Sequence, residues 1–209
     1  MNLIQSSLKL PCGAEIKNRI GKSAMTERIA DSNNFVNQKH LNLYQRWSEG
    51  ECGLLISGNV MVDRFNLEGA GNIILDQRNY KDQLETLKKW TEIGTRNQAH
   101  FWIQLSHAGR QTPMEINKTP MAPSSVQLKI PGRRYGVPIE MNNQDIINTI
   151  DQFVFAAKIA QEVGFTGVQL HSAHGYLLSQ FLSPNINQRN DEWGGSIENR
   201  SRLLIEIIR

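Results

Sequence analysis

Apolar and polar positions along this chain follow two alternating spacings. Short apolar runs, typical of buried strands, occur within residues 53–62, 100–105 and 166–171. Between these runs, apolar residues recur three or four positions apart, which is the spacing of a helix with one buried face. The pattern therefore predicts alternating strands and helices, an order typical of a parallel α/β sheet covered by helices.

The predicted helices lie between these strands and after the last one. They cover the segment of Leu41, Tyr44 and Trp47 as far as Gly50, residues 80–93, residues 145–163 and residues 196–209. Asn142 and Asp145 resemble a capping arrangement before the third helix, and Gly164 is suited to end it. The apolar positions of the last helix include Ile197, Leu204 and Ile208.

The N-terminal part adds a hairpin and one more strand. Two short apolar runs flank Pro11-Cys12-Gly13, which predicts a β-hairpin over residues 8–16. Residues 18–25 are predicted to form the first strand of the sheet. Four strand–helix units thus follow an N-terminal hairpin.

Residues 106–140 interrupt the alternation. They hold five of the seven prolines and show little periodicity, so they are predicted to form a long loop. A long loop in a compact domain is usually functional, for example as a lid over a site, and the alternative is a disordered insert.

Small or hydrogen-bonding residues follow each of the four predicted strands. They are Ala24-Met25-Thr26, Ser57-Gly58-Asn59, Gln104 with Ser106-His107, and His171 with His174. In parallel α/β folds the carboxyl ends of the strands lie together and form the binding site. Four such coincidences predict one composite site rather than scattered polar residues in the core.

Residues 171–176 carry the densest candidate chemistry. His171, His174 and Tyr176 can bind an anion or transfer a proton. A metal site is the alternative, because His-x-x-His can place two imidazoles on one side of a turn. Nearby spacing suggests no third ligand, so no metal is predicted. The sequence lacks the glycine-rich phosphate loops and the Gly-x-Ser-x-Gly elbow, and Gly69-Ala70-Gly71 completes no such motif.

Composition narrows the class of protein further. The 209 residues hold 23 basic and 20 acidic side chains, a net charge of +3, which is too balanced to favour nucleic-acid binding. No apolar run is long enough to cross a membrane, and we expect no secretory signal at the N-terminus. Cys12 and Cys52 make a poor disulfide framework, so a cytoplasmic protein is expected.

Five motifs run in order through the chain. They are KNRI leading to SAMT in residues 17–26, WIQLSHAGRQ at 102–111, HSAHGYLL at 171–178, QFLSP at 180–184 and RNDEWGGSIENR at 189–200. Together they resemble the motifs of the old yellow enzyme family of FMN-dependent oxidoreductases. The resemblance implies a (β/α)8 TIM barrel with FMN across its carboxyl-terminal mouth, of which residues 1–209 hold the first four units.

The resemblance also implies roles for the residues that follow the strands. Ala24, Met25 and Thr26 would line the flavin ring, with Thr26 near its carbonyl edge. Gly58 would let the ring approach the second strand, where a side chain would collide with it. Gln104 would hydrogen-bond the pyrimidine edge of the ring with its amide.

The implied reaction is reduction of the activated C=C bond of an α,β-unsaturated carbonyl compound, with NAD(P)H as the reductant of FMN. His171 and His174 would hold the carbonyl oxygen of this small-molecule substrate, where negative charge builds up. Tyr176 would be the catalytic proton donor to the α-carbon.

The resemblance ends after the fourth unit, whereas a (β/α)8 barrel typically needs about 250 residues. The second half of the family's barrel supplies an arginine near the flavin and the loops that bind its phosphate, so the chain alone is expected to bind FMN poorly. The first alternative is a catalytically inactive half-barrel that acts as an assembly module, either as a homo-oligomer or with a complementing C-terminal half. The second is a metal-dependent hydrolase that uses His171 and His174.

Overall fold

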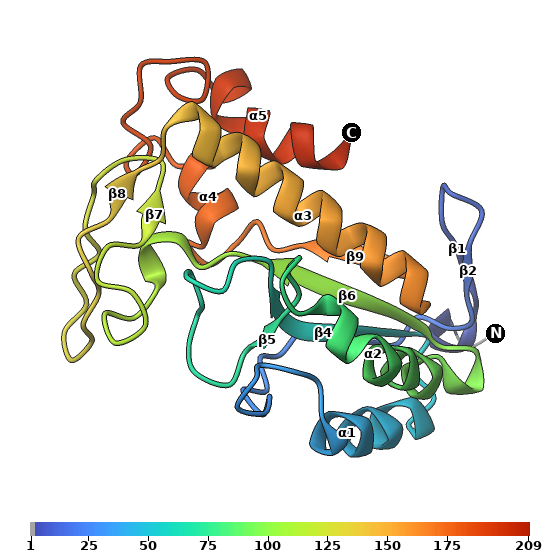
Figure 1. Cartoon of the computed structure of the whole chain (residues 1–209). Helices are drawn as coiled ribbons and strands as arrows, with labels where there is room; N and C mark the ends of the chain where they lie inside the picture. Colours follow the sequence, from blue (N-terminus) through green and yellow to red (C-terminus); the bar gives the residue numbers. More distant parts are fainter. Residues whose placement is uncertain (1–2) are drawn as a thin grey trace.

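A computed structural model describes residues 3–209 (Figure 1). In chain order the elements are the 3-10 helix η1 (Leu3–Gln5), strands β1 (Leu8–Lys9), β2 (Glu15–Ile16) and β3 (Gly21–Lys22), helix α1 (Gln38–Glu49), strands β4 (Leu54–Met61) and β5 (Ile73–Ile74), helix α2 (Tyr80–Gly94), the 3-10 helix η2 (Arg96–Gln98), strand β6 (His100–Ser106), the 3-10 helix η3 (Gly109–Gln111), strands β7 (Met121–Ala122) and β8 (Ile139–Glu140), helix α3 (Asn143–Val163), strand β9 (Gly167–Leu170), and helices α4 (Leu177–Leu182) and α5 (Ile197–Ile208).

A parallel sheet in the order β3-β4-β6-β9 forms the centre of the molecule, and β5 pairs with the end of β4. Helix α1 packs beside α2, α2 beside α3, and α3 beside α5, while α2 and α3 also contact β6. Figure 1 shows the hairpin β1–β2 at one end of the sheet and the loop with β7 and β8 at the other. This arrangement is that of a partial (β/α) barrel, as predicted.

The local sequence signals account for most of these elements. The antiparallel pair β1–β2 confirms the predicted hairpin. Asn142 and Asp145 form a capping box at the start of α3, in which each side chain bonds the backbone amide of the other residue. Gly164 follows with φ of 100°, a left-handed conformation that favours glycine and that ends the helix.

One predicted element differs from the structure. The predicted strand over residues 18–25 is wrong in its extent, because only Gly21 and Lys22 pair with β4 before the chain leaves the sheet. Helix α5 confirms the helix predicted over residues 196–209, and its buried residues are Leu203 and Ile207, whereas Ile197 and Ile208 are 55% and 65% exposed. Apolar residues lie nearly all around the C-terminal part of this helix, so their spacing does not identify which face is buried.

The core beneath the sheet is built around one aromatic side chain. Trp90 of α2 is fully buried and packs edge-on against Tyr44 of α1 and Phe101 of β6, with ring centroids 5.0 and 5.2 Å away. A Cβ on Gly94 would lie 2.2 Å from the ring of Phe101. The glycine that closes α2 therefore lets this helix lie directly on β6.

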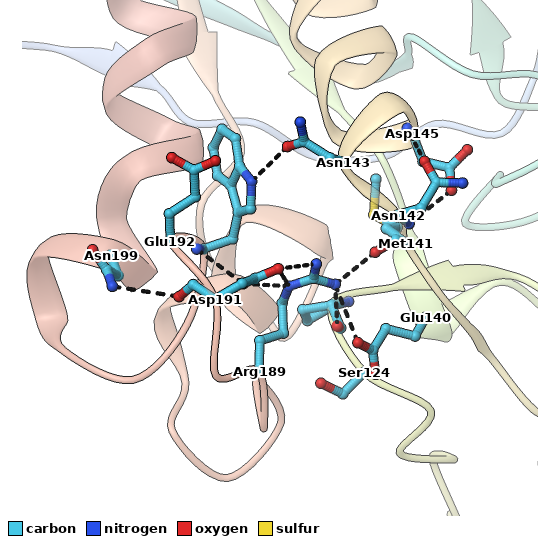
Figure 2. A network of polar contacts seen from close by, with 12 residues as sticks. Ser124, Glu140, Met141, Asn142, Asn143, Asp145, Arg189, Asp191, Glu192 and Asn199 are labelled. Carbon is cyan, nitrogen blue, oxygen red and sulfur yellow. Dashed lines mark hydrogen bonds and ion pairs between the residues drawn. The ribbon is translucent and has the colours of Figure 1, made fainter.

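The long loop is built into the fold rather than being a disordered insert. Within it, β7 pairs with β8, and Pro113 forms a bridge with Tyr135. The buried Arg189 donates to the carbonyl oxygens of Pro123 and Met141, at 3.1 and 2.6 Å. Figure 2 shows this guanidinium between the loop and Asp191, which it also contacts. One arginine thus ties residues 123–141 to the segment before α5.

Within residues 3–209, no helix has the length and apolar character that a membrane crossing requires.

Candidate active site

A cavity of about 650 Å³ opens at the carboxyl ends of the parallel strands. Six of the eight predicted site residues line it, namely Ala24, Thr26, Gln104, His171, His174 and Tyr176. The side chain of Met25 is 51% exposed and does not line the cavity, and neither does Gly58. The structure therefore brings together most of the residues whose strand-end positions predicted a composite site.

An irregularity in β4 sets the position of Gln104. Between Ile56 and Asn59 the pairing with β6 shifts, so that two residues of β4 face one residue of β6. At this irregularity the hydroxyl oxygen of Ser57 accepts a hydrogen bond from the backbone N–H of Gln104, at 2.9 Å. This bond replaces the missing bond between the two strands. The side chain of Gln104 then donates from Nε2 to Oε1 of Gln169 at 2.6 Å, which leaves its own Oε1 to accept from a ligand.

Gly58 sits where the chain after β3 crosses β4. A Cβ at this position would lie 2.4 Å from the carbonyl oxygen of Met25 and 2.9 Å from the Cα of Thr26. These contacts with the protein's own backbone account for the glycine, so the absence of a side chain here is explained without a cofactor. The close crossing also places Thr26 at the wall of the cavity.

The two predicted histidines contact each other. Nε2 of His171 lies 3.3 Å from Nδ1 of His174, and the rings are nearly perpendicular. His174 has φ of 56°, a strained conformation for a residue with a side chain, and Gln111 donates to its carbonyl oxygen. Burial and the neighbouring His174 lower the pKa of His171, so this ring is neutral at pH 7.

Tyr176 packs edge-on against His171, with ring centroids 4.8 Å apart. Burial and the nearby carboxylate of Glu68 raise the pKa of its hydroxyl to about 12, so the proton stays on the tyrosine at neutral pH. A protonated hydroxyl on the cavity wall is the state that a proton donor needs.

Sequence reasoning missed one acidic residue of the site. Glu68 accepts hydrogen bonds from Thr26 at 3.0 Å and Asn59 at 2.6 Å, although 42 residues separate it from Thr26. Its side chain is only 14% exposed. The one sequence signal near it was Gly69-Ala70-Gly71, which fits no nucleotide motif and so gave no reason to single out its neighbour.

The described part of the chain contains no cluster of three or more His, Cys, Asp or Glu residues able to hold a metal ion. Cys12 and Cys52 are both free.

Fold and site together define a portion of a parallel (β/α) barrel with a polar cavity at the carboxyl ends of its strands. The chain belongs to the NADH:flavin oxidoreductase / NADH oxidase family, whose sequence profile matches residues 9–209. The family assignment agrees with the resemblance that the motifs carry.

The names of individual relatives agree with this family. The chain is 34% identical to the NADH-dependent flavin oxidoreductase iliE of Hypocrea jecorina over 96% of its length and 54% of the relative's. It is 36% identical to an NADPH dehydrogenase of Bacillus cytotoxicus, over 92% of this chain and 54% of that protein. The chain thus spans about half the length of the curated relatives it matches.

A solved structure with the same fold is the old yellow enzyme from Pichia sp. AKU4542. It superposes with a TM-score of 0.87 at 30% identity, covering 99% of this chain and 55% of the other. The described elements therefore correspond to about half of that barrel.

Proposed function

We propose that this chain forms the substrate-holding part of an FMN-dependent oxidoreductase that uses NAD(P)H to reduce the activated C=C bond of α,β-unsaturated carbonyl compounds. The observation that carries the proposal is the cavity in which the contacting pair His171 and His174 lies beside the protonated hydroxyl of Tyr176. Hydrogen-bond donors for a carbonyl oxygen and a proton donor for carbon are the groups that this reduction requires.

The cavity suits a flat polar ring such as that of FMN. Among the described residues, Oδ1 of Asn59 and Oγ of Ser172 are buried without a hydrogen-bond partner, and both residues line the cavity. Buried polar atoms of this kind are normally satisfied, and polar groups of a bound ring would reach them if these side chains turned toward the cavity. Gln104 adds a free amide oxygen, and Ala24 and Thr26 supply a wall without bulky side chains.

FMN reduced by NAD(P)H supplies the hydride equivalent for this chemistry. The chain's own residues handle the oxygen and the proton. A donor from the histidine pair bonds the substrate's carbonyl oxygen and stabilises the negative charge that develops on it, at roughly 3 kcal/mol per donor. Tyr176 releases its proton to the α-carbon and regains one from solvent.

We propose further that additional barrel strands cover the free edge of β9. An apolar groove of about 580 Å³ runs there, lined among others by Val168, Leu170, Leu204 and Ile207. An exposed edge beside an apolar groove invites pairing with another strand. The second half of the same barrel fits this surface, since the relatives are about twice as long. Two free cysteines support a cytoplasmic location for such a protein.

The proposal is tested with the polypeptide as it is naturally expressed, purified and titrated with FMN. We expect flavin fluorescence to be quenched on binding, and NADH or NADPH to bleach the bound flavin under anaerobic conditions. Addition of 2-cyclohexenone should then restore the flavin colour. Gln104→Ala should weaken FMN binding about tenfold, since it removes a hydrogen bond to the ring, whereas Gln161→Ala, on the exposed surface of α3, should not.

The assignment of Tyr176 is tested by separating the two half-reactions. Tyr176→Phe should slow reoxidation by the enone and leave flavin reduction by NAD(P)H largely intact. A colourless protein that binds no FMN and forms a defined oligomer would overturn the proposal in favour of an inactive assembly module.

A further inference from the structure

Two glutamines of the sequence motifs have no part in the proposed reaction, yet both donate to the backbone that carries the site. Gln111 of η3 donates from Nε2 to the carbonyl oxygen of His174. Gln180 of α4 donates from Nε2 to the carbonyl oxygen of Gly175, at 2.7 Å. Side chains from two separate elements thus bond the two consecutive carbonyl groups that directly precede Tyr176.

Both of these carbonyl groups belong to residues with left-handed backbone. His174 has φ of 56° and Gly175 has φ of 74°. Glycine adopts such a conformation readily, whereas histidine does not, so the surrounding structure must hold His174 in place. A Cβ on Gly175 would lie 2.6 Å from Nε2 of Gln111. The glycine therefore leaves the space through which the amide of Gln111 reaches the carbonyl oxygen of His174.

The amide of Gln180 is buried and fully used. The residue is 1% exposed. Its Nε2 also donates to the carbonyl oxygen of Ala108 at 3.2 Å, and its Oε1 accepts from the backbone N–H of Arg110 at 3.2 Å. Gly109 has φ of 56°, and a Cβ there would lie 2.4 Å from Oε1 of Gln180. Because every hydrogen-bonding group of the amide has a partner, its orientation is fixed against the segment that follows β6.

The backbone held in this way carries two residues of the cavity wall. His174 and Tyr176 both line the cavity, and both of their rings contact the ring of His171. Gln111 and Gln180 are not among the residues that line it. The two glutamines therefore act on the cavity through the backbone and not by facing a ligand.

We propose that Gln111 and Gln180 are positioning residues, which together hold the backbone of His174 and Gly175 and so set the places of the His174 ring and the Tyr176 hydroxyl in the cavity. The catalytic meaning of this inference rests on the proposed function, but the contacts themselves do not. A hydrogen-bond donor and a proton donor act only within reach of the reacting atoms, so a shift of this segment by about 1 Å is costly.

The first experiment follows backbone hydrogen exchange in residues 171–177 by mass spectrometry, on the natural, full polypeptide without FMN or substrate. The N–H of Tyr176 donates to the carbonyl oxygen of Ala173 at 3.2 Å, so its exchange reports opening of the segment. Gln180→Met keeps the length of the side chain and removes its amide. We expect it to speed exchange in this segment about tenfold, and we expect the same of Gln111→Met.

Gln83→Met is the matched control. Gln83 is also 1% exposed, and its Nε2 donates to the carbonyl oxygen of Ile74 at 2.7 Å, so the variant removes an equally buried amide from another part of the fold. We expect it to leave exchange in residues 171–177 unchanged. General loss of stability would instead speed exchange in this segment in both variants.

The second experiment measures the single-turnover rate of the enone half-reaction on the FMN-loaded protein. Gln180→Met should slow it by about 10- to 100-fold, and Gln83→Met should not change it. In a Tyr176→Phe background the further loss caused by Gln180→Met should be smaller, because part of its effect acts through the hydroxyl that is already absent. A role in stability alone gives no such dependence on Tyr176.

Unchanged exchange in residues 171–177 of Gln180→Met overturns the proposal, and so does equal acceleration in Gln83→Met. If Gln180→Met fails to fold, Gln111→Met, at a half-buried position, is judged by the same criteria. In a protein that reduces enones, an unchanged rate or an equal loss in the Tyr176→Phe background also overturns it. Faster local exchange in a protein that reduces no enone would support the hold on the backbone and would contradict the proposed function alone.

Discussion

His171 and His174 form a directional chain of hydrogen bonds. The amide of Ala173 donates to Nδ1 of His171 at 3.3 Å, so the neutral ring carries its hydrogen on Nε2. That hydrogen points at Nδ1 of His174, 3.3 Å away, and the hydrogen of His174 then lies on Nε2. His174 is therefore the terminal donor of the pair, and His171 fixes its tautomer.

This order of hydrogen bonds predicts that removing the ring of His174 strongly slows the reaction with substrate. We expect His174→Ala to slow enone reduction by about 10²- to 10³-fold, because it removes the donor that we propose for the developing negative charge. The single-turnover rate of the enone half-reaction, measured on the FMN-loaded protein, checks this. His100→Ala is the control, since His100 contacts the carbonyl oxygen of Glu15 at the opposite end of the sheet. Equal losses in the two variants would contradict the assignment.

The close crossing at Gly58 predicts a structural cost for any side chain there. We expect Gly58→Ala to lower the free energy of unfolding by about 1–3 kcal/mol, since the new Cβ strikes backbone atoms of Met25 and Thr26. Urea unfolding measures the loss. Gly21→Ala is a matched control on β3, where the nearest atoms would lie 3.9 Å away. Comparable losses at both positions would show that the crossing is not what constrains Gly58.

The N-terminus of α1 predicts a dependence of stability on pH. Burial lowers the pKa of His40 from 6.5 to about 4, against a smaller opposing influence of Asp31. Between these values the unfolded chain binds more protons at this ring than the folded chain, so stability falls as pH falls from 6.5 to 4. The loss is of the order of 3 kcal/mol, at ~1.4 kcal/mol per pKa unit.

Replacing His40 with glutamine removes the titratable ring but can keep the hydrogen bond that caps α1. In the capping box, Nδ1 of His40 accepts a hydrogen bond from the backbone N–H of Asn37, and the side-chain oxygen of a glutamine can accept the same bond. We expect His40→Gln to lose less stability than the natural protein between pH 7 and pH 4.5, as measured by urea unfolding at both values. Parallel losses would assign the acid sensitivity to other groups.

The contacts of Arg189 predict that this side chain stabilises the long loop, residues 106–140, against the rest of the fold. Arg189→Lys keeps the charge but gives up the fork of donors that reaches Asp191 and the two carbonyl oxygens at once. We expect a loss of about 1.5–3 kcal/mol in unfolding free energy and faster proteolysis within residues 106–140. Arg134→Lys should change neither, because its ion pair with Glu115 is exposed on both sides. The same protease sensitivity in both variants would contradict this role.

The sequence predicted the features that depend on near neighbours. Helical spacing and terminal glycines located α1 to α3, and the capping pair Asn142–Asp145 located the start of α3 within two residues. Strand-end positions predicted most of the cavity wall. Short elements escaped detection, because the two-residue strand β5 and the six-residue helix α4 span too few residues for a periodic signal.

Contacts between distant segments could not be predicted in this way. The burial of Leu203 rather than Leu204 depends on how α5 meets α3 and α4. The convergence of Thr26, Asn59 and Arg28 on Glu68 depends on the crossing of three segments. The functional role of the long loop stays a prediction, although its contact with the carbonyl oxygen of His174 through Gln111 places it beside the cavity.

Strand β9 borders two hollows at once. Gln169, Leu170 and Ser172 line both the polar cavity and the apolar groove at the free edge of the sheet. A ligand that shifted these residues from the cavity side would also change the edge that a strand paired with β9 meets, and by thermodynamic reciprocity such a coupling would act equally in both directions. One short strand thus forms the shared wall between the place where a ligand would bind and the edge where another strand would pair.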